Sequence, residues 1–178
     1  MKKAFYLCLL LACFSCGTNS NNGSNQEGAS KEYTKTFEEF GFSISAPCIL
    51  EDVSSQVSGT FEANYGGIVN PDDPENATVY QVAVTKLPSD IEGLSEADQQ
   101  EILDQRMNLE NAGFTNVKKV LFSDNNYIGY VGDTQHNGLM QRGMMFKKGK
   151  HIITLTVLTN IDLDEKFNKF TNSFKVID

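Results

Sequence analysis

The sequence is poor in the residues from which catalytic and metal sites are usually built. It has 178 residues but only two histidines, His136 and His151, whose separation does not match a zinc-binding motif. It contains no G-x-S-x-G motif, no G-x-G-x-x-G motif and no Walker sequence. Cys48 is the single cysteine after residue 16, and we interpret it as a small, half-buried thiol beside Pro47 rather than as half of a Cys–His pair. We therefore expect a protein that is not an enzyme and that has no catalytic residues.

Basic residues are also few. The chain has 15 Lys and Arg against 23 Asp and Glu, which gives a formal net charge of −8. An acidic surface repels a phosphate backbone, so we expect no nucleic-acid partner. The hydrophobic content of 40% is nevertheless sufficient for the core of one globular domain.

No hydrophobic run is long enough for a membrane span. Lys2 and Lys3 precede the apolar residues 4–12, a run much shorter than the roughly 20 residues that a transmembrane helix needs. A basic start followed by a short apolar run is typical of a signal peptide. Two cysteines follow this run, and each has a small residue before it: Ala12 before Cys13, and Ser15 before Cys16.

This stretch resembles the lipobox of bacterial lipoproteins, in which a leucine and two small residues precede a lipid-carrying cysteine. The resemblance implies that residues 1–15 are a signal peptide, that Cys16 is the lipid attachment site, and that the lipid holds the protein in the inner or outer membrane of the bacterial cell envelope. Cys13 is the alternative site, because Leu10-Leu11-Ala12-Cys13 matches the motif better. Cleavage at Cys16 instead leaves a longer signal and starts the polar stretch at once, at Gly17. Secretion without lipid and an uncleaved anchor also stay open.

The polar stretch separates this leader from a folded domain. Residues 16–33 are rich in Asn, Ser and Gly and lack hydrophobic periodicity, which predicts a flexible tether. Structural patterning begins near Thr34, and neither an internal repeat nor a second linker follows. We therefore predict one domain over residues 34–178.

Alternating hydrophobic residues predict most of this domain to be strands. The sequence FEEFGFSISAP (residues 37–47) predicts two short strands with a kink at Gly41. Tyr80, Val82 and Val84 alternate with other residues and should share one face of a strand. NPDDPEN (residues 70–76) is a loop by composition, and KKGK (residues 147–150) is a hairpin turn. Further strands are expected near residues 61–65, 117–122, 127–131, 139–146 and 152–159.

Two segments have helical patterns. A helix is expected over residues 95–112, with Ser95 as its N-cap, Asp98 at the capping-box position, and Gly113 as its C-terminal stop.

The second helix should close the chain, and Asp162 and Glu165 should cap its start. Its apolar residues lie within about 60° of one another on a helix, so they should pack on the sheet as one stripe. They are Leu163, Phe167, Phe170 and Phe174, whereas Asp164, Lys166, Asn168 and Lys169 should face water.

Consecutive strands with one inserted helix and one terminal helix predict an α+β fold, in which helices flank an antiparallel sheet. With FGFSISAP (residues 40–47) opening the domain and FNKFTNSFKV (residues 167–176) closing it, this layout resembles the α/β/α sandwich of the photosynthetic PsbP proteins and the Ran-binding Mog protein. The resemblance implies a binding domain and transfers no functional residue.

These observations predict a membrane-anchored envelope lipoprotein whose domain binds a protein or a small ligand. Its partners would be the membrane, through the lipid, and an envelope protein. We expect no cofactor and no metal, although Asp72, Asp73 and Glu75 in NPDDPEN could bind a hard cation. The alternative is an envelope hydrolase that uses Cys48 or acidic residues clustered by folding.

Overall fold

The computed structural model describes residues 31–56, 61–106, 113–123, 127–136 and 138–177. The predicted signal peptide, both candidate lipidation sites, Cys13 and Cys16, and residues 16–30 of the predicted tether lie outside these ranges. The first described strand begins at Tyr33.

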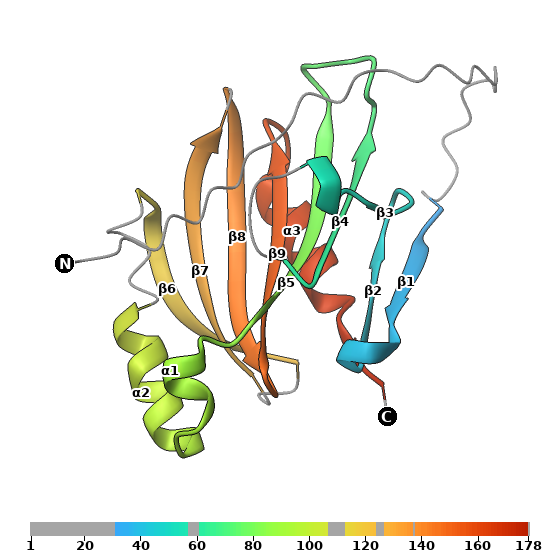
Figure 1. The fold of residues 1–178 in the computed structure, drawn as a ribbon. Coiled ribbons are helices and arrows are strands. Elements are labelled where there is room, and N and C mark those ends of the chain that lie inside the picture. Colours follow the sequence, from blue (N-terminus) through green and yellow to red (C-terminus); the bar gives the residue numbers. More distant parts are fainter. Residues whose placement is uncertain (1–30, 57–60, 107–112, 124–126, 137, 178) are drawn as a thin grey trace.

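The described strands form two antiparallel sheets (Figure 1). In the smaller sheet, β2 (Phe42–Ala46) pairs with β1 (Tyr33–Phe37) on one side and with β10 (Lys175–Val176) on the other. Between β1 and β2 the chain makes a 3-10 turn (Glu38–Phe40), followed by Gly41 at φ +66°. This left-handed conformation favours glycine and explains the predicted kink. The larger sheet has the order β3 (Glu51–Asp52), β4 (Ala63–Val69), β5 (Thr78–Lys86), β9 (His151–Thr159), β8 (Leu139–Lys148), β7 (Tyr127–His136) and β6 (Thr115–Phe122).

Helices lie on both faces of the larger sheet. In Figure 1, α1 (Ser89–Glu92) and α2 (Glu96–Arg106) lie in front of its lower left part, whereas α3 (Leu163–Asn172) lies behind it. The arrangement confirms the predicted α+β fold with an antiparallel sheet flanked by helices.

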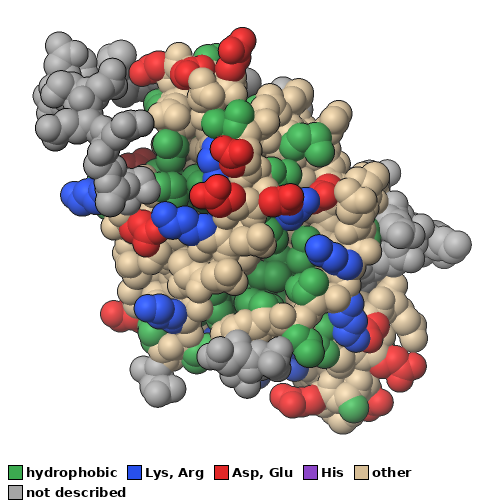
Figure 2. Space-filling model, turned by 180° about the vertical axis from the view of Figure 1, so that it is seen from behind, with side chains coloured by type: hydrophobic (Ala, Val, Ile, Leu, Met, Phe, Trp, Pro, Cys, Tyr) green, Lys and Arg blue, Asp and Glu red, His purple; other side chains and the backbone are tan. Residues whose placement is uncertain are grey.

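The main hydrophobic core lies between α3, the β1–β2 hairpin and the larger sheet. The predicted stripe is buried: Phe167 is 4% exposed, Phe170 2% and Phe174 5%. These rings join the same cluster as the inner face of β5, which carries Tyr80, Val82 and Val84 as predicted. Seen from the α3 side, acidic and basic side chains surround a central area of hydrophobic side chains (Figure 2).

Three details of the last helix differ from the prediction. The helix ends at Asn172, so Phe174 reaches the core from the residues that follow it rather than from a fourth helical turn. Asp162 makes no side-chain capping bond, because its backbone adopts a left-handed conformation with φ +51°. Lys166 is only partly exposed and folds back onto the sheet, where its ammonium finds two oxygen acceptors.

A second cluster lies on the opposite face, where Ile91 of α1 and Leu103 of α2 pack near Tyr130 of β7. The N-cap of α2 is confirmed: Ser95 Oγ accepts a bond from the Asp98 backbone N–H and donates one to the Asp98 carboxylate. The described helix ends at Arg106, and the predicted continuation over residues 107–112 lies outside the described residues. The four-residue helix α1 was not predicted, because one helical turn is too short to show a periodic pattern.

Replacing Phe170 with alanine should test the core directly. Because this ring is 2% exposed, Phe170→Ala should lower the free energy of unfolding by about 3–5 kcal/mol in denaturant melts. Leu121→Ala is the matched control, because Leu121 is 61% exposed and its loss should cost less than about 0.5 kcal/mol. Equal effects of the two substitutions would contradict the assigned core.

Candidate ligand-binding cavity

The structure keeps Cys48 away from both histidines. The Cys48 side chain packs on Gly67, where an added Cβ would lie 2.7 Å from Sγ. Gly67 pairs with Tyr80 of β5, whereas His151 pairs with Lys86 near the end of the same strand. Because Tyr80 and Lys86 are about 20 Å apart along β5, Cys48 and His151 are separated by a similar distance. His136 is on β7, four strands from β4 in the sheet order, which is about 19 Å at the usual interstrand spacing.

Burial also makes Cys48 a poor nucleophile. Desolvation raises the pKa of its thiol to about 11, so the thiol stays protonated at neutral pH, and the thiolate is the reactive form. The structure therefore places Cys48 as the half-buried thiol that we predicted, without a histidine beside it.

The loop NPDDPEN (residues 70–76), whose acidic residues could bind a cation, is held by hydrogen bonds between its own residues. Asp73 accepts a 2.6 Å bond from the side-chain amide of Asn76, which lowers the pKa of Asp73. Within the described ranges, no three His, Cys, Asp or Glu side chains converge in a way that could hold a metal ion. In the same ranges, no helix has both the length and the apolar character needed to cross a membrane.

A cavity of about 250 Å³ opens between α3, the β1–β2 hairpin and strands β4 and β5. Part of its wall is apolar and comes from Ala46, Pro47, Val69 and Phe170. The remaining wall carries hydroxyl, amide and charged groups. Sequence reasoning did not find this cavity, because its walls come from segments far apart in the chain.

Tyr80 contributes a hydroxyl group to this wall. The residue is 4% exposed, and its ring meets the Phe170 ring edge-on, with 5.2 Å between the ring centroids. Burial raises the pKa of the phenol to about 12, so it is a neutral donor at physiological pH. Among the residues that the structure describes, none hydrogen bonds to this hydroxyl; the side-chain polar atom that is both fully buried and unpaired in the described ranges is Asn64 Nδ2, not the Tyr80 hydroxyl.

Lys166 contributes a cation to the same wall. Its ammonium donates to Thr78 Oγ1 at 3.2 Å and to the carbonyl oxygen of Ile161 at 3.1 Å. In the described part of the chain, no carboxylate oxygen lies within 4.0 Å of this ammonium. Among the described protein groups, therefore, the Lys166 ammonium contacts only neutral oxygens.

The mouth of the cavity carries carboxylates of two different kinds. Glu32, directly before β1, pairs with Lys169 of α3 at 2.9 Å. Glu165 is exposed, and no described basic side chain pairs with it. Glu32 thus has a basic partner at the opening, whereas Glu165 has none among the described residues.

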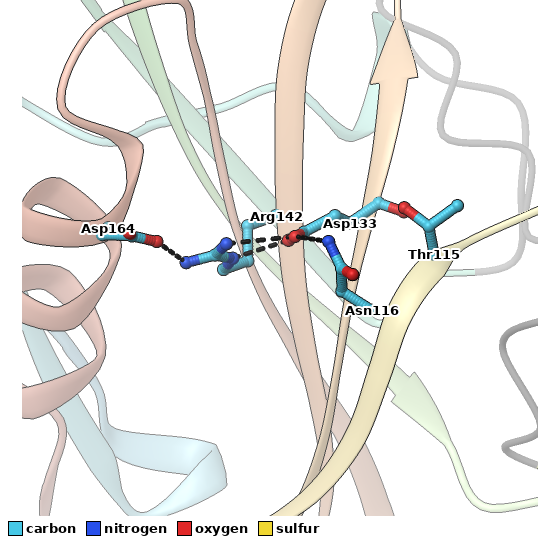
Figure 3. A network of polar contacts seen from close by, with 5 residues as sticks. All are labelled: Thr115, Asn116, Asp133, Arg142 and Asp164. Carbon is cyan, nitrogen blue, oxygen red and sulfur yellow. Dashed lines mark hydrogen bonds and ion pairs between the residues drawn. The ribbon is translucent and has the colours of Figure 1, made fainter.

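A polar network fixes α3 against the sheet (Figure 3). Arg142 of β8 holds Asp133 of β7 through two bonds, of 2.6 and 3.0 Å, and also contacts Asp164 of α3. Asn116 donates a further bond to Asp133 at 3.0 Å, and the Arg142 guanidinium lies over the ring of Phe167. The hydrogen bonds from Arg142 lower the pKa of Asp133, which is 4% exposed.

This network gives a stability prediction. Arg142→Met should lower the free energy of unfolding by about 3–5 kcal/mol, because it leaves the Asp133 charge buried without its partner. Arg106→Met is the matched control. Arg106 pairs with Asp90 at 2.5 Å, but their side chains are 42% and 60% exposed, so its loss should cost less than about 1 kcal/mol. Equal losses in denaturant melts would show that the network contributes no more than a surface pair.

The same network predicts how stability depends on pH. Since folding lowers the pKa of Asp133, the unfolded chain binds a proton more readily, and the stabilisation is present above the unfolded pKa of about 3.9 and is lost as pH falls below it. The stability difference between the native chain and Asp133→Asn should therefore be constant above about pH 5 and shrink towards pH 2. Urea melts across this range measure it, and a difference that does not change with pH would contradict the assignment.

Comparison with known proteins supports the fold. No protein-family model matches the sequence, and no curated protein matches it. Among solved structures, the chain is similar to the solution structure of cyanobacterial PsbP (CyanoP) from Synechocystis sp. PCC 6803, with a TM-score of 0.54 and 14% sequence identity. The match covers 87% of this chain and 98% of that chain. At this identity the likeness shows the fold alone: the domain has a PsbP-like fold, as the sequence resemblance predicted.

Proposed function

We propose that the chain is a lipid-anchored protein of the bacterial cell envelope, and that its PsbP-like domain is a non-catalytic binding module. In this proposal residues 1–15 are removed, Cys16 carries the lipid, with Cys13 as the alternative, and residues 16–33 tether the domain to the inner or outer membrane. The domain would bind a small ligand or an envelope protein partner.

One observation carries the binding role. The cavity beside α3 is lined by the Tyr80 phenol and by the partly buried Lys166 ammonium, and neither contacts a carboxylate among the described residues. A concave site that combines apolar walls with a few polar groups is typical of ligand binding. The alternative envelope hydrolase has weaker support, because the Cys48 thiol is protonated at neutral pH and lies about 20 Å from either histidine in the strand register.

The order of segments supports the anchor. Two lysines, a short apolar run, small residues, a cysteine and a polar stretch follow one another as a lipoprotein leader requires. Lys31 and Glu32 are exposed where the described chain enters β1, so a tether can leave the domain there without crossing the core.

Metabolic labelling of the full chain in a bacterial host with a palmitate analogue tests the anchor. The native chain should carry the label and sediment with membranes, because several acyl chains hold a protein stably. Cys16→Ser should abolish both, whereas the matched variant Cys13→Ser should keep both. Inhibition of lipoprotein signal cleavage should leave a larger precursor, and mass spectrometry of the mature N-terminus identifies the cleavage point.

One result would contradict the lipid anchor, and another would change its attachment site. An unlabelled native chain whose size is unchanged by the inhibitor would exclude the lipoprotein. Label that survives Cys16→Ser but disappears in Cys13→Ser would move the attachment site to Cys13.

A further inference from the structure

We propose that the cavity beside α3 binds a small carboxylate with a short apolar body, and that Lys166 and Tyr80 bind its carboxylate group. The inference rests on the binding role proposed above and adds the site and the class of ligand. It does not depend on lipid attachment.

Two groups at this site can donate hydrogen bonds that no described residue accepts. Burial of the residue raises the pKa of the Tyr80 phenol to about 12, so the phenol is neutral, and no described group accepts its proton. The Lys166 ammonium has two described acceptors, Thr78 Oγ1 and the Ile161 carbonyl oxygen, out of the three bonds that it can donate. An oxyanion that enters the cavity could accept from both donors.

The strand and helix bring these two donors to one wall. Thr78 and Tyr80 are two residues apart on β5, so their side chains leave the same face of the sheet. The bond from Lys166 to Thr78 ties the ammonium to that face. The Phe170 ring, one helical turn after Lys166, packs on Tyr80 and completes the wall.

The shape and charge of the cavity favour a carboxylate over other ligands. A cation would meet an ammonium and a phenol that both donate. An inorganic phosphate could accept from the same two donors, but it has no apolar part to contact the apolar section of the wall. A small volume of about 250 Å³ with walls from Ala46, Val69 and Phe170 suits a short apolar body behind the charged group.

The charges at the mouth of the cavity predict the direction in which each substitution changes the affinity for an anion. Glu32 is paired with Lys169, but Glu165 is not paired with any described basic group. An anionic ligand is attracted by Lys166 and repelled by Glu165. Removing the first charge should therefore weaken binding, and removing the second should strengthen it.

The experiment is a titration of the ¹⁵N-labelled full chain, in a non-ionic detergent, with sodium benzoate, followed by NMR. We expect saturable shifts at residues of the cavity wall. Lys166→Met should raise the dissociation constant at least about tenfold, which is the usual weight of a hydrogen bond to a charged group. Tyr80→Phe should raise it several-fold, and Glu165→Gln should lower it about twofold. Tyr127→Phe, which changes a partly buried tyrosine outside the cavity, should leave it unchanged.

A stability measurement shows whether weaker benzoate binding in Tyr80→Phe comes from partial unfolding. Because the Tyr80 hydroxyl has no described protein partner, Tyr80→Phe should unfold at the same denaturant concentration as the native chain. A loss of benzoate binding in this variant is then a loss of a ligand contact rather than a loss of fold.

Four results would overturn the inference: no saturable shift with benzoate, undiminished binding in Lys166→Met, weaker binding in Glu165→Gln, or tighter binding of methylammonium or inorganic phosphate than of benzoate. If benzoate does not bind while the palmitate label still depends on Cys16, the carboxylate site is wrong and the lipid anchor is retained. Loss of the label with benzoate binding intact would instead remove the anchor and keep the site.

Discussion

The packing of α3 against the larger sheet is the interaction on which the rest of the structure depends. Phe167, Phe170 and Phe174 enter one cluster with the inner residues of β5, β8 and β9 and with the β1–β2 hairpin. Phe42 of that hairpin stacks on Phe174 at 5.3 Å between ring centroids, so the hairpin packs on a surface that α3 and the residues after it provide. The cavity exists because these three parts meet without filling the space between them, and Phe170 belongs both to the core and to the cavity wall.

Polar contacts fix the orientation that the aromatic rings leave free. Hydrophobic burial is not directional, whereas Arg142 holds Asp133 of the sheet and Asp164 of α3 at defined atoms. After the helix, Ser173 Oγ accepts from the Ser45 backbone N–H and donates to the Ser45 carbonyl oxygen, both at 2.9 Å. Together these contacts set where Lys166 lies relative to Tyr80, which is the geometry that the proposed binding site requires.

Local pattern was enough to predict the architecture, but it could not predict the candidate site. The sequence pattern indicates which face of an element is buried, through alternation in a strand (Tyr80, Val82, Val84) and through helical spacing in α3 (Phe167, Phe170). The structure places both faces in the core. Nothing in the sequence around Asp133 and Arg142 indicates that they are buried, and they form a buried pair only through the β7–β8 register. Lys166 was expected in water because it lies off the aromatic stripe, yet acceptors at Thr78 and Ile161 draw its long side chain onto the sheet. Such tertiary contacts leave no periodic signal in the chain.

Native-state hydrogen exchange of the full chain tests most directly whether α3 is an inseparable part of the core. If it is, the buried amides of α3 and β2 should open with the same free energy as those of the central strand β9, to within about 1 kcal/mol, because one cooperative unit unfolds at once. Amides of α3 that open several kcal/mol more readily than those of β9 would show that the helix detaches by itself. That result would contradict the account, because the cavity between α3, the hairpin and the sheet would then not be a permanent feature of the fold.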